Sequence, residues 1–238
     1  MELTGATIIK VPPVINAGTV QAFRSALEPA MNDAAGVVVL AGADDVFCRG
    51  MELSPFGAGE ELRESVESFA VCLEVIRKGD KPVIAHVQGQ AAGGGVGLAA
   101  ACDGVLAATG ASFTLSELLF GLTPAVILPY LAQRVNLQKL CWMGLTAGTL
   151  TGQEAVEAGL ADAVCPPEKA PAILRAWIRK LRRIERKTVG TWKRMTIQSP
   201  LPGSKDGIEF TLERLADPAV SERLRAFFET GEPPWMKE

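Results

Sequence analysis

A glycine-rich stretch at residues 81–103 constrains the fold of this chain more than any other segment. It begins with an apolar run at 83–87, passes through a turn with three adjacent glycines, and continues with small residues that favour a helix starting near Gly94. Because glycine has no Cβ, another backbone segment or a ligand can come very close to such a turn. The first turn of the helix has unpaired N–H groups and partial positive charge, which suit an anion or a developing oxyanion. The alternative is that the glycines only pack the helix tightly on the strand.

The rest of the chain is patterned as alternating strands and helices, followed by helices alone. Short segments rich in apolar residues predict strands at 6–11, 36–40, 83–87, 104–108 and 160–164, of which 36–40 is a continuous apolar run. Apolar spacings of three and four predict helices near 17–32, 61–78, 126–134, 136–143, 151–159, 168–196, 204–216 and 218–229. Thr151 and Glu154 match a capping box at the start of one of them. This order predicts an α/β core in residues 1–165 and an α-helical region in residues 166–238.

The composition excludes several classes of function. With 238 residues and 48% hydrophobic content, the chain can bury the core of one domain. The net charge of −3 gives no basic excess for nucleic acid or an anionic membrane. No apolar run reaches membrane-spanning length, and no export signal is present at the N-terminus. Five scattered cysteines and a single histidine argue against a zinc site or disulfide framework. We therefore expect a cytoplasmic protein without metal, nucleic-acid or membrane partners.

Three separated motifs resemble those of the crotonase superfamily, also called the enoyl-CoA hydratase/isomerase family. Residues 46–53 (VFCRGMEL) resemble FxAGxDL, residues 81–95 (KPVIAHVQGQAAGGG) resemble KPVIAAVNGxAxGGG, and residues 116–124 (SELLFGLTP) resemble PEIxLGLxP. Residues 151–164 resemble a further segment of the family, and the likeness covers about residues 5–235. The resemblance implies an α/β spiral of ββα turns with a helical C-terminal trimerisation region. It also implies a homotrimer or a dimer of trimers.

The resemblance implies a shared chemistry, which is the stabilisation of a thioester enolate. By motif position, the backbone N–H groups of Met51 and Gly94 would form an oxyanion hole for the thioester oxygen. Each such donor can lower a barrier by roughly 3–4 kcal/mol. The substrate would be carried on coenzyme A or on the phosphopantetheine of an acyl-carrier protein, so no separate cofactor is expected. Four residues of the same motifs are expected to contact the substrate: Arg49, Gly93, Leu122 and Pro124.

The family's hydratases move protons with two glutamates, and this chain keeps only one of them. The first glutamate position holds Gly97, whereas Glu117 occupies the second. One carboxylate beside an oxyanion hole suits a shuttle that shifts a double bond, so we expect an enoyl-thioester isomerase with Glu117 as base. Apolar neighbours at 115 and 118–120 would desolvate this carboxylate and raise its pKa. The structural alternative is that Thr114 and Glu117 form a capping box.

The carrier of the acyl group remains open in the sequence. Where the family's C-terminal helix has basic residues that hold coenzyme A phosphates, this chain has Thr230, Gly231 and Glu232. Residues 120–124 (FGLTP) also resemble a segment of crotonase-like enzymes from polyketide β-branching, which decarboxylate a glutaconyl thioester. Their catalytic lysine and histidine have no clear match here, and Met195 stands where the histidine is expected. A decarboxylase or isomerase acting on carrier-protein-bound intermediates is therefore the second hypothesis.

Two further residues and one further function complete the expectations. His86 lies in the middle of an apolar strand and is expected to be a buried structural histidine. Arg49 replaces a small residue of the family's turn, and we expect it to be solvated, paired with an acid, or close to a phosphate. Because Gly97 removes one carboxylate, the third hypothesis is a non-catalytic partner subunit with the same fold.

Overall fold

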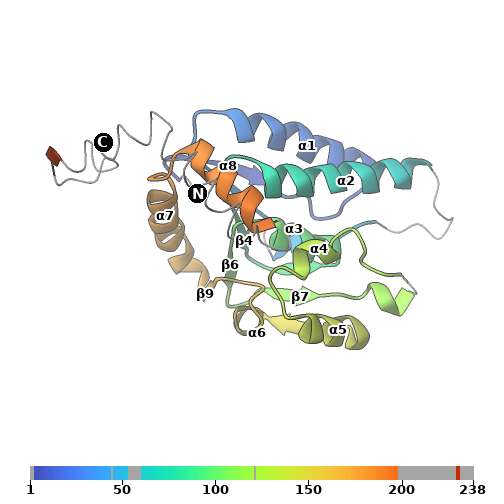
Figure 1. Cartoon of the computed structure of the whole chain (residues 1–238). Helices are drawn as coiled ribbons and strands as arrows, with labels where there is room; N and C mark the ends of the chain where they lie inside the picture. The colour runs from blue at the N-terminus through green and yellow to red at the C-terminus, as the bar shows by residue number, and fades with distance from the viewer. Residues whose placement is uncertain (1–2, 44, 53–59, 121, 198–228, 231–238) are drawn as a thin grey trace, which may run out of the picture.

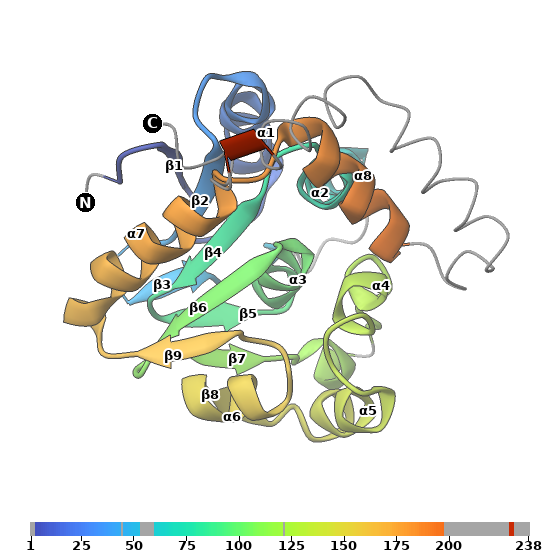
Figure 2. The ribbon, with the colours of Figure 1, turned by 60° about the vertical axis from the view of Figure 1, so that its left-hand side comes forward.

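The computed structural model describes residues 3–43, 45–52, 60–120, 122–197 and 229–230. Its centre is a five-stranded parallel sheet in the order β1-β2-β4-β6-β9. Figure 1 labels β4, β6 and β9 of this sheet, and Figure 2 labels all of its strands. The strands are β1 (Ala6–Lys10), β2 (Val37–Ala41), β4 (Val83–Val87), β6 (Gly104–Ala108) and β9 (Ala163–Cys165). Every residue of β2 and β4 is buried, as expected for strands covered on both faces.

A second sheet lies beside the first, in the order β3-β5-β7-β8. Its strands have three residues each: β3 (Val46–Cys48), β5 (Gln90–Ala92), β7 (Ser112–Thr114) and β8 (Thr149–Thr151). The first three are parallel, and β8 joins β7 antiparallel. The chain therefore passes from the large sheet to the small one and back through a helix, which is the spiral of ββα turns that the resemblance implies.

Helices cover both faces of the large sheet (Figure 2). On one face α1 (Ala17–Asn32), α2 (Glu60–Lys78) and α3 (Gly94–Ala101) enclose the main hydrophobic core. On the other face α7 (Ala170–Leu181) packs on a second apolar cluster that includes Val39, Ile84 and Leu106. The remaining helical elements are η1 (Glu117–Phe120), α4 (Leu128–Leu131), α5 (Leu137–Thr146), α6 (Gly152–Glu157), η2 (Pro167–Lys169) and α8 (Arg186–Ile197).

The mixed α/β fold is confirmed, with corrections to individual elements. The predicted helix at 168–196 is wrong as one unit, because α7 ends at Leu181 and α8 begins at Arg186. The chain turns between them because α7 packs on β6 while α8 packs on α2. The last strand covers Ala163–Cys165 rather than 160–164, and α4 is shorter than predicted. The predicted helix at 204–216, and the one at 218–229 except for its last residue, lie outside the described residues. The last strand, β9, ends at Cys165, where the predicted α/β core also ends. The role of residues 166–238 in trimerisation stays a prediction.

A buried lysine fixes α8 to the core. The Lys193 ammonium donates to the carbonyls of Ile76 (2.7 Å) and Lys81 (3.0 Å) and to the carboxylate of Asp103 (2.7 Å). We expect Lys193→Met to lower the free energy of unfolding by about 2 kcal/mol, because it leaves buried acceptors without their donor. Urea unfolding measures the change. Arg194→Met, which removes an exposed pair with Asp80, is the control and should cost no more than about 1 kcal/mol. Equal losses in the two variants would contradict the anchoring role.

Candidate active site

The turn after β3 presents Met51 to the small sheet. The N–H of Ile15 donates to Gly50 O and the N–H of Glu52 donates to Ile15 O, both at 2.8 Å. Ile15 and Met51 thus form a parallel bridge, in which Ile15 is hydrogen-bonded to the two residues that flank Met51. The N–H of Met51 itself therefore points away from Ile15. Gly50 has a φ of +86°, a conformation that side chains rarely adopt. The turn is thus held on both flanks of Met51.

The glycines that start α3 lie directly against this turn. A Cβ added at Gly50 would stand 2.9 Å from Gly94 N, and one at Gly95 would stand 2.0 Å from Cys48 O. The close approach predicted for the glycine-rich stretch is therefore present, between the end of β3 and the start of α3. Within the part of the chain that the structure describes, no backbone carbonyl accepts a hydrogen bond from the N–H of Met51 or Gly94. Both donors remain available to a ligand.

Glu117 lies across from the same glycines. It is the first residue of η1, and its Oε1 would stand 3.0 Å from a Cβ at Gly93. Its Oε2 is buried and has no hydrogen-bond partner among the described residues. Burial raises the pKa of Glu117, against the opposing effect of the backbone N–H groups of Glu117 and Ser116. The carboxyl group is therefore half-buried, aimed at the start of α3, and not engaged in structural hydrogen bonds through Oε2.

Two expectations about Glu117 need correction. Thr114 does not cap η1, because its hydroxyl is bonded to that of Thr149 at 2.8 Å within the β7–β8 pair. The raised pKa is as predicted, but two of the apolar neighbours expected to desolvate the carboxyl group are largely exposed. Leu119 and Phe120 are 68% and 69% exposed. The Gly93 turn, which lies far from Glu117 in the sequence, stands against the carboxyl group.

The raised pKa of Glu117 predicts a pH dependence for any reaction in which it is the base. Only the carboxylate accepts a proton, so the rate should fall as pH is lowered through the pKa of Glu117. Since burial raises this pKa, the midpoint should lie above 4.5, the ordinary value for glutamate. A pH profile of kcat/KM measures it. A rate that stays level through this range, or that rises with acidity, would contradict a basic role.

The position that holds the other glutamate of the hydratases is Gly97 in this chain, and Ile127 leaves no room there for a side chain. A Cβ added at Gly97 would stand 2.1 Å from Ile127 Cγ2 and 2.4 Å from Ile127 Cβ. Ile127 is 3% exposed and precedes α4, so its side chain is fixed in the core. No side chain can be added at this point of α3 without displacing Ile127. The sequence does not reveal this contact, because 30 residues separate the two positions and no motif joins them.

The other predicted site residues lie at varying distances from this centre. The N–H of Leu122 donates to Glu117 O at 3.0 Å, and Pro124 O accepts the N–H of Leu128 at 2.9 Å. Both belong to the segment that leads from η1 to α4. Arg49 is exposed, and its Nε donates to Gln90 Oε1 at 3.2 Å. The roles of Arg49, Gly93, Leu122 and Pro124 in substrate binding stay predictions.

His86 and Cys48 are two buried titratable groups that have no place in the chemistry of this site. His86 is 5% exposed, and both ring nitrogens are buried without a hydrogen-bond partner among the described residues. Burial lowers the pKa of His86, which favours the neutral ring. It lies on the face of β4 shared with Ile84, away from the main core. Burial also raises the pKa of Cys48 to about 11, which disfavours a nucleophilic thiolate.

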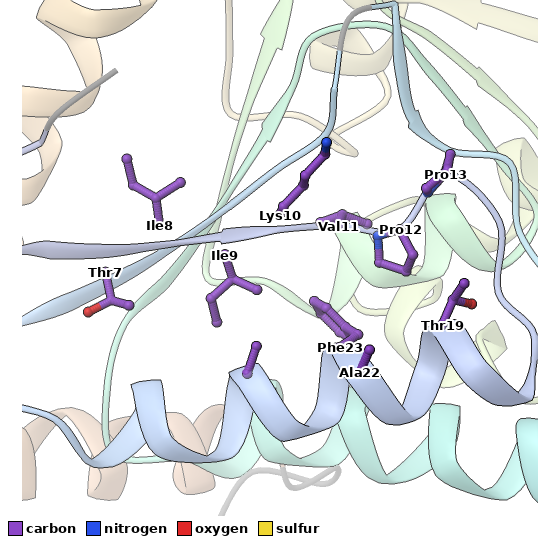
Figure 3. Close-up of a pocket in the computed structure, with 11 residues that line it drawn as sticks. Thr7, Ile8, Ile9, Lys10, Val11, Pro12, Pro13, Thr19, Ala22 and Phe23 are labelled. Carbon is purple, nitrogen blue, oxygen red and sulfur yellow. The ribbon is translucent and has the colours of Figure 1, made fainter.

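A separate open groove of about 420 Å³ lies between β1 and α1 (Figure 3). Figure 3 shows Ile9 and Phe23 between the strand and the helix, while Ile8 and Lys10 point to the other side of β1. The groove contains none of the predicted site residues.

In the described ranges no helix has both the length and the apolar content of a membrane span, and no group of side chains suits a metal ion.

Comparison with known proteins identifies a family for the chain. A family model described as enoyl-CoA hydratase/isomerase matches residues 10–238. The chain is 32% identical over 206 residues to the bacillaene synthase dehydratase PksH of Bacillus subtilis, covering 84% of this chain and 79% of PksH. Among solved structures, Pseudomonas aeruginosa AtuE has a TM-score of 0.87 at 26% identity, covering 100% of this chain and 98% of AtuE.

A solved structure of pksH is also similar to this chain. The solved structure of pksH from Bacillus subtilis, described as a polyketide biosynthesis enoyl-CoA hydratase, has a TM-score of 0.71 at 27% identity. The match covers 98% of this chain and 97% of that one. The family model spans nearly the whole chain, and the fold and the order of the motifs agree with it. The chain belongs to the enoyl-CoA hydratase/isomerase (crotonase) family.

Proposed function

We propose that this protein removes a proton from the carbon next to the carbonyl of an acyl thioester, with Glu117 as the base. The N–H groups of Met51 and Gly94 would donate to the carbonyl oxygen and stabilise the enolate that forms. The observation that carries the proposal is the Glu117 carboxyl group, which lies against Gly93 with Oε2 buried and unpartnered. A half-buried carboxyl group with one oxygen free of structural partners, beside two free N–H donors, has the arrangement of a general base.

A single carboxylate must then handle every proton, because Ile127 fills the space beside Gly97. We propose that the reaction is the dehydration of a β-hydroxyacyl thioester. Glu117 takes the α-proton, and the electron pair of that C–H bond forms the enolate. The enolate collapses to a carbon–carbon double bond as the β-carbon–oxygen bond breaks, and the protonated Glu117 returns its proton to the departing hydroxyl. The products are the enoyl thioester and water. The similarity to a protein named a dehydratase supports this outcome.

A double-bond shift is the second candidate, because one carboxylate is enough for it. Glu117 would remove the α-proton of a Δ3-enoyl thioester and return it to the γ-carbon, which gives the Δ2-enoyl isomer. The closed position at Gly97 favours this reaction over the two-glutamate addition of water. Loss of CO2 from a glutaconyl thioester would use the same oxyanion hole, so the experiment below includes that substrate.

We propose that the acyl group arrives on a carrier protein of a polyketide synthase. The similarity to PksH and the absence of basic residues at 230–232 support this carrier over coenzyme A. We also propose a homotrimer, or a dimer of trimers, since large apolar side chains are exposed on η1, α5 and α8: Leu119, Phe120, Leu137, Trp142, Leu145 and Trp192. Sedimentation measures the assembly, and a monomer at micromolar concentration would contradict it.

Mass spectrometry of a substrate panel tests the proposed reaction. The panel contains β-hydroxyacyl, Δ3-enoyl and glutaconyl thioesters, each loaded on coenzyme A and on a carrier protein. The expected result is loss of water from the β-hydroxyacyl carrier-protein thioester, and its absence with Glu117→Gln. A shifted double bond without loss of water would support the second candidate. Release of CO2 that survives Glu117→Gln would contradict Glu117 as the base, and no turnover or binding of any thioester would favour the non-catalytic subunit.

A further inference from the structure

Arg49 is an exposed arginine in the turn after β3, and it has no acidic partner among the described residues. Its N–H donates to Pro13 O at 2.8 Å, which holds the backbone, and its side-chain Nε donates to Gln90 Oε1 at 3.2 Å. Glu52, the nearest acidic residue that follows it, accepts a hydrogen bond from Asn16 Nδ2 at 2.8 Å instead. The two terminal amino groups of the guanidinium are therefore available to an anion.

Several other cations of the described chain differ from Arg49, because each stands within hydrogen-bond distance of a carboxylate: Arg24 with Glu28 (2.6 Å), Lys78 with Glu74 (2.9 Å) and Arg194 with Asp80 (2.9 Å). Arg49 has only the neutral amide of Gln90, so its charge is not cancelled by a neighbour. An uncancelled positive charge beside a site attracts anionic ligands to it.

The strand β5 connects Arg49 to the candidate base. Gln90 and Ala92 share the outer face of β5, whereas Ala91 between them is buried in the core. The next residue, Gly93, is the one whose added Cβ would stand 3.0 Å from Glu117 Oε1. From Gln90 to Gly93 the chain advances three residues, or about 10 Å for extended backbone. A ligand that lies along this face from Glu117 therefore reaches the guanidinium after a span on the order of 10 Å.

We propose that Arg49 binds an anionic group of the substrate, on the order of 10 Å from the carbon that Glu117 deprotonates. The inference rests on the proposed function, because it places the reacting carbon beside Glu117. A carboxylate at the far end of the acyl chain and the phosphate of the phosphopantetheine arm have the same chemistry. Each offers two or more oxygens to the fork of a guanidinium. Gln90 holds Nε and so orients that fork.

Calorimetric binding of four saturated thioesters tests the proposal and separates the two sources of the anion. The acyl chain either ends in a carboxylate or does not, and the arm is either pantetheine or phosphopantetheine. Arg49→Gln should weaken the binding of one anionic series by about tenfold and leave the neutral acyl-pantetheine within about twofold. The series that loses affinity identifies the anion. Arg49→Lys keeps the charge without the fork and should lose less.

The control is Arg24→Gln, which removes the same charge from α1 and should change no binding constant by more than about twofold. An equal loss for all four thioesters with Arg49→Gln, or no loss for any of them, would contradict the proposal. Saturated thioesters without a β-hydroxyl cannot be dehydrated, so this measurement does not depend on turnover. If the binding pattern holds while Glu117→Gln retains full activity, the anion site stands and the proposed base is wrong.

Discussion

Glu117→Gln is expected to lower the rate of α-proton exchange by about 10²–10⁴-fold while leaving the fold intact. Glutamine keeps the shape and the hydrogen-bonding oxygen of glutamate but cannot accept the proton. The carboxyl group lies against Gly93, and its buried Oε2 has no partner among the described residues, so its loss removes no structural hydrogen bond there. The rate is measured as deuterium uptake at the α-carbon of a saturated acyl thioester in D2O, followed by mass spectrometry.

The matched control for this variant is Glu157→Gln. Glu157 is an exposed glutamate on α6 that accepts a hydrogen bond from Gln153 at 3.2 Å. Its loss should leave the exchange rate within about twofold, since an exposed pair contributes little. The melting temperature of both variants should stay near that of the original protein. Exchange by Glu117→Gln within a few-fold of the original rate would show that another group is the base.

Gly97→Glu, which restores the residue of the two-glutamate hydratases, is expected to destabilise the protein rather than create a hydratase. The Cβ alone would stand 2.1 Å from Ile127 Cγ2, and the carboxylate would be forced into an apolar core. Overpacking and a buried, unpartnered polar group together should lower the free energy of unfolding by about 3 kcal/mol or more. Urea unfolding measures this loss.

Two comparisons isolate the contact with Ile127. Gly110→Glu places the same side chain where nothing lies within 4 Å of an added Cβ, so it should cost less than about 1 kcal/mol. In the double variant Gly97→Glu/Ile127→Ala, the smaller residue makes room, and the loss should be less than the sum of the two single losses. Strict additivity of the two changes, or a fully stable Gly97→Glu, would contradict the closure of this position.

The sequence predicts the centre of the large sheet well because β2 and β4 are buried, largely apolar runs. The strand at 83–87 and the helix at 17–32 are confirmed with the same bounds, and the capping box of Thr151 and Glu154 is formed. The small sheet was missed, because its strands have three residues each and lie within turns rich in glycine or polar residues. Such short strands are held by pairing with distant segments, and local periodicity carries no sign of that pairing.

The candidate site shows the same division between local pattern and long-range packing. Met51, Gly94 and Glu117 could be named from their motifs, and the structure brings the Gly50–Met51 turn, Gly94 and Glu117 to one place. The effect of burial on the pKa of Glu117 could be predicted only in direction, since the contact of the carboxyl group with Gly93 joins segments that are distant in the sequence. The contact of Ile127 with Gly97 could not be predicted, because it depends on how two helices meet.

A crystal structure with a saturated acyl thioester tests the central claim most directly. The account predicts that the carbonyl oxygen lies about 3 Å from both the Met51 and Gly94 nitrogens, with the α-carbon facing the Glu117 carboxyl group. A thioester bound elsewhere, such as in the groove between β1 and α1, or bound with its carbonyl turned away from these two nitrogens, would contradict it.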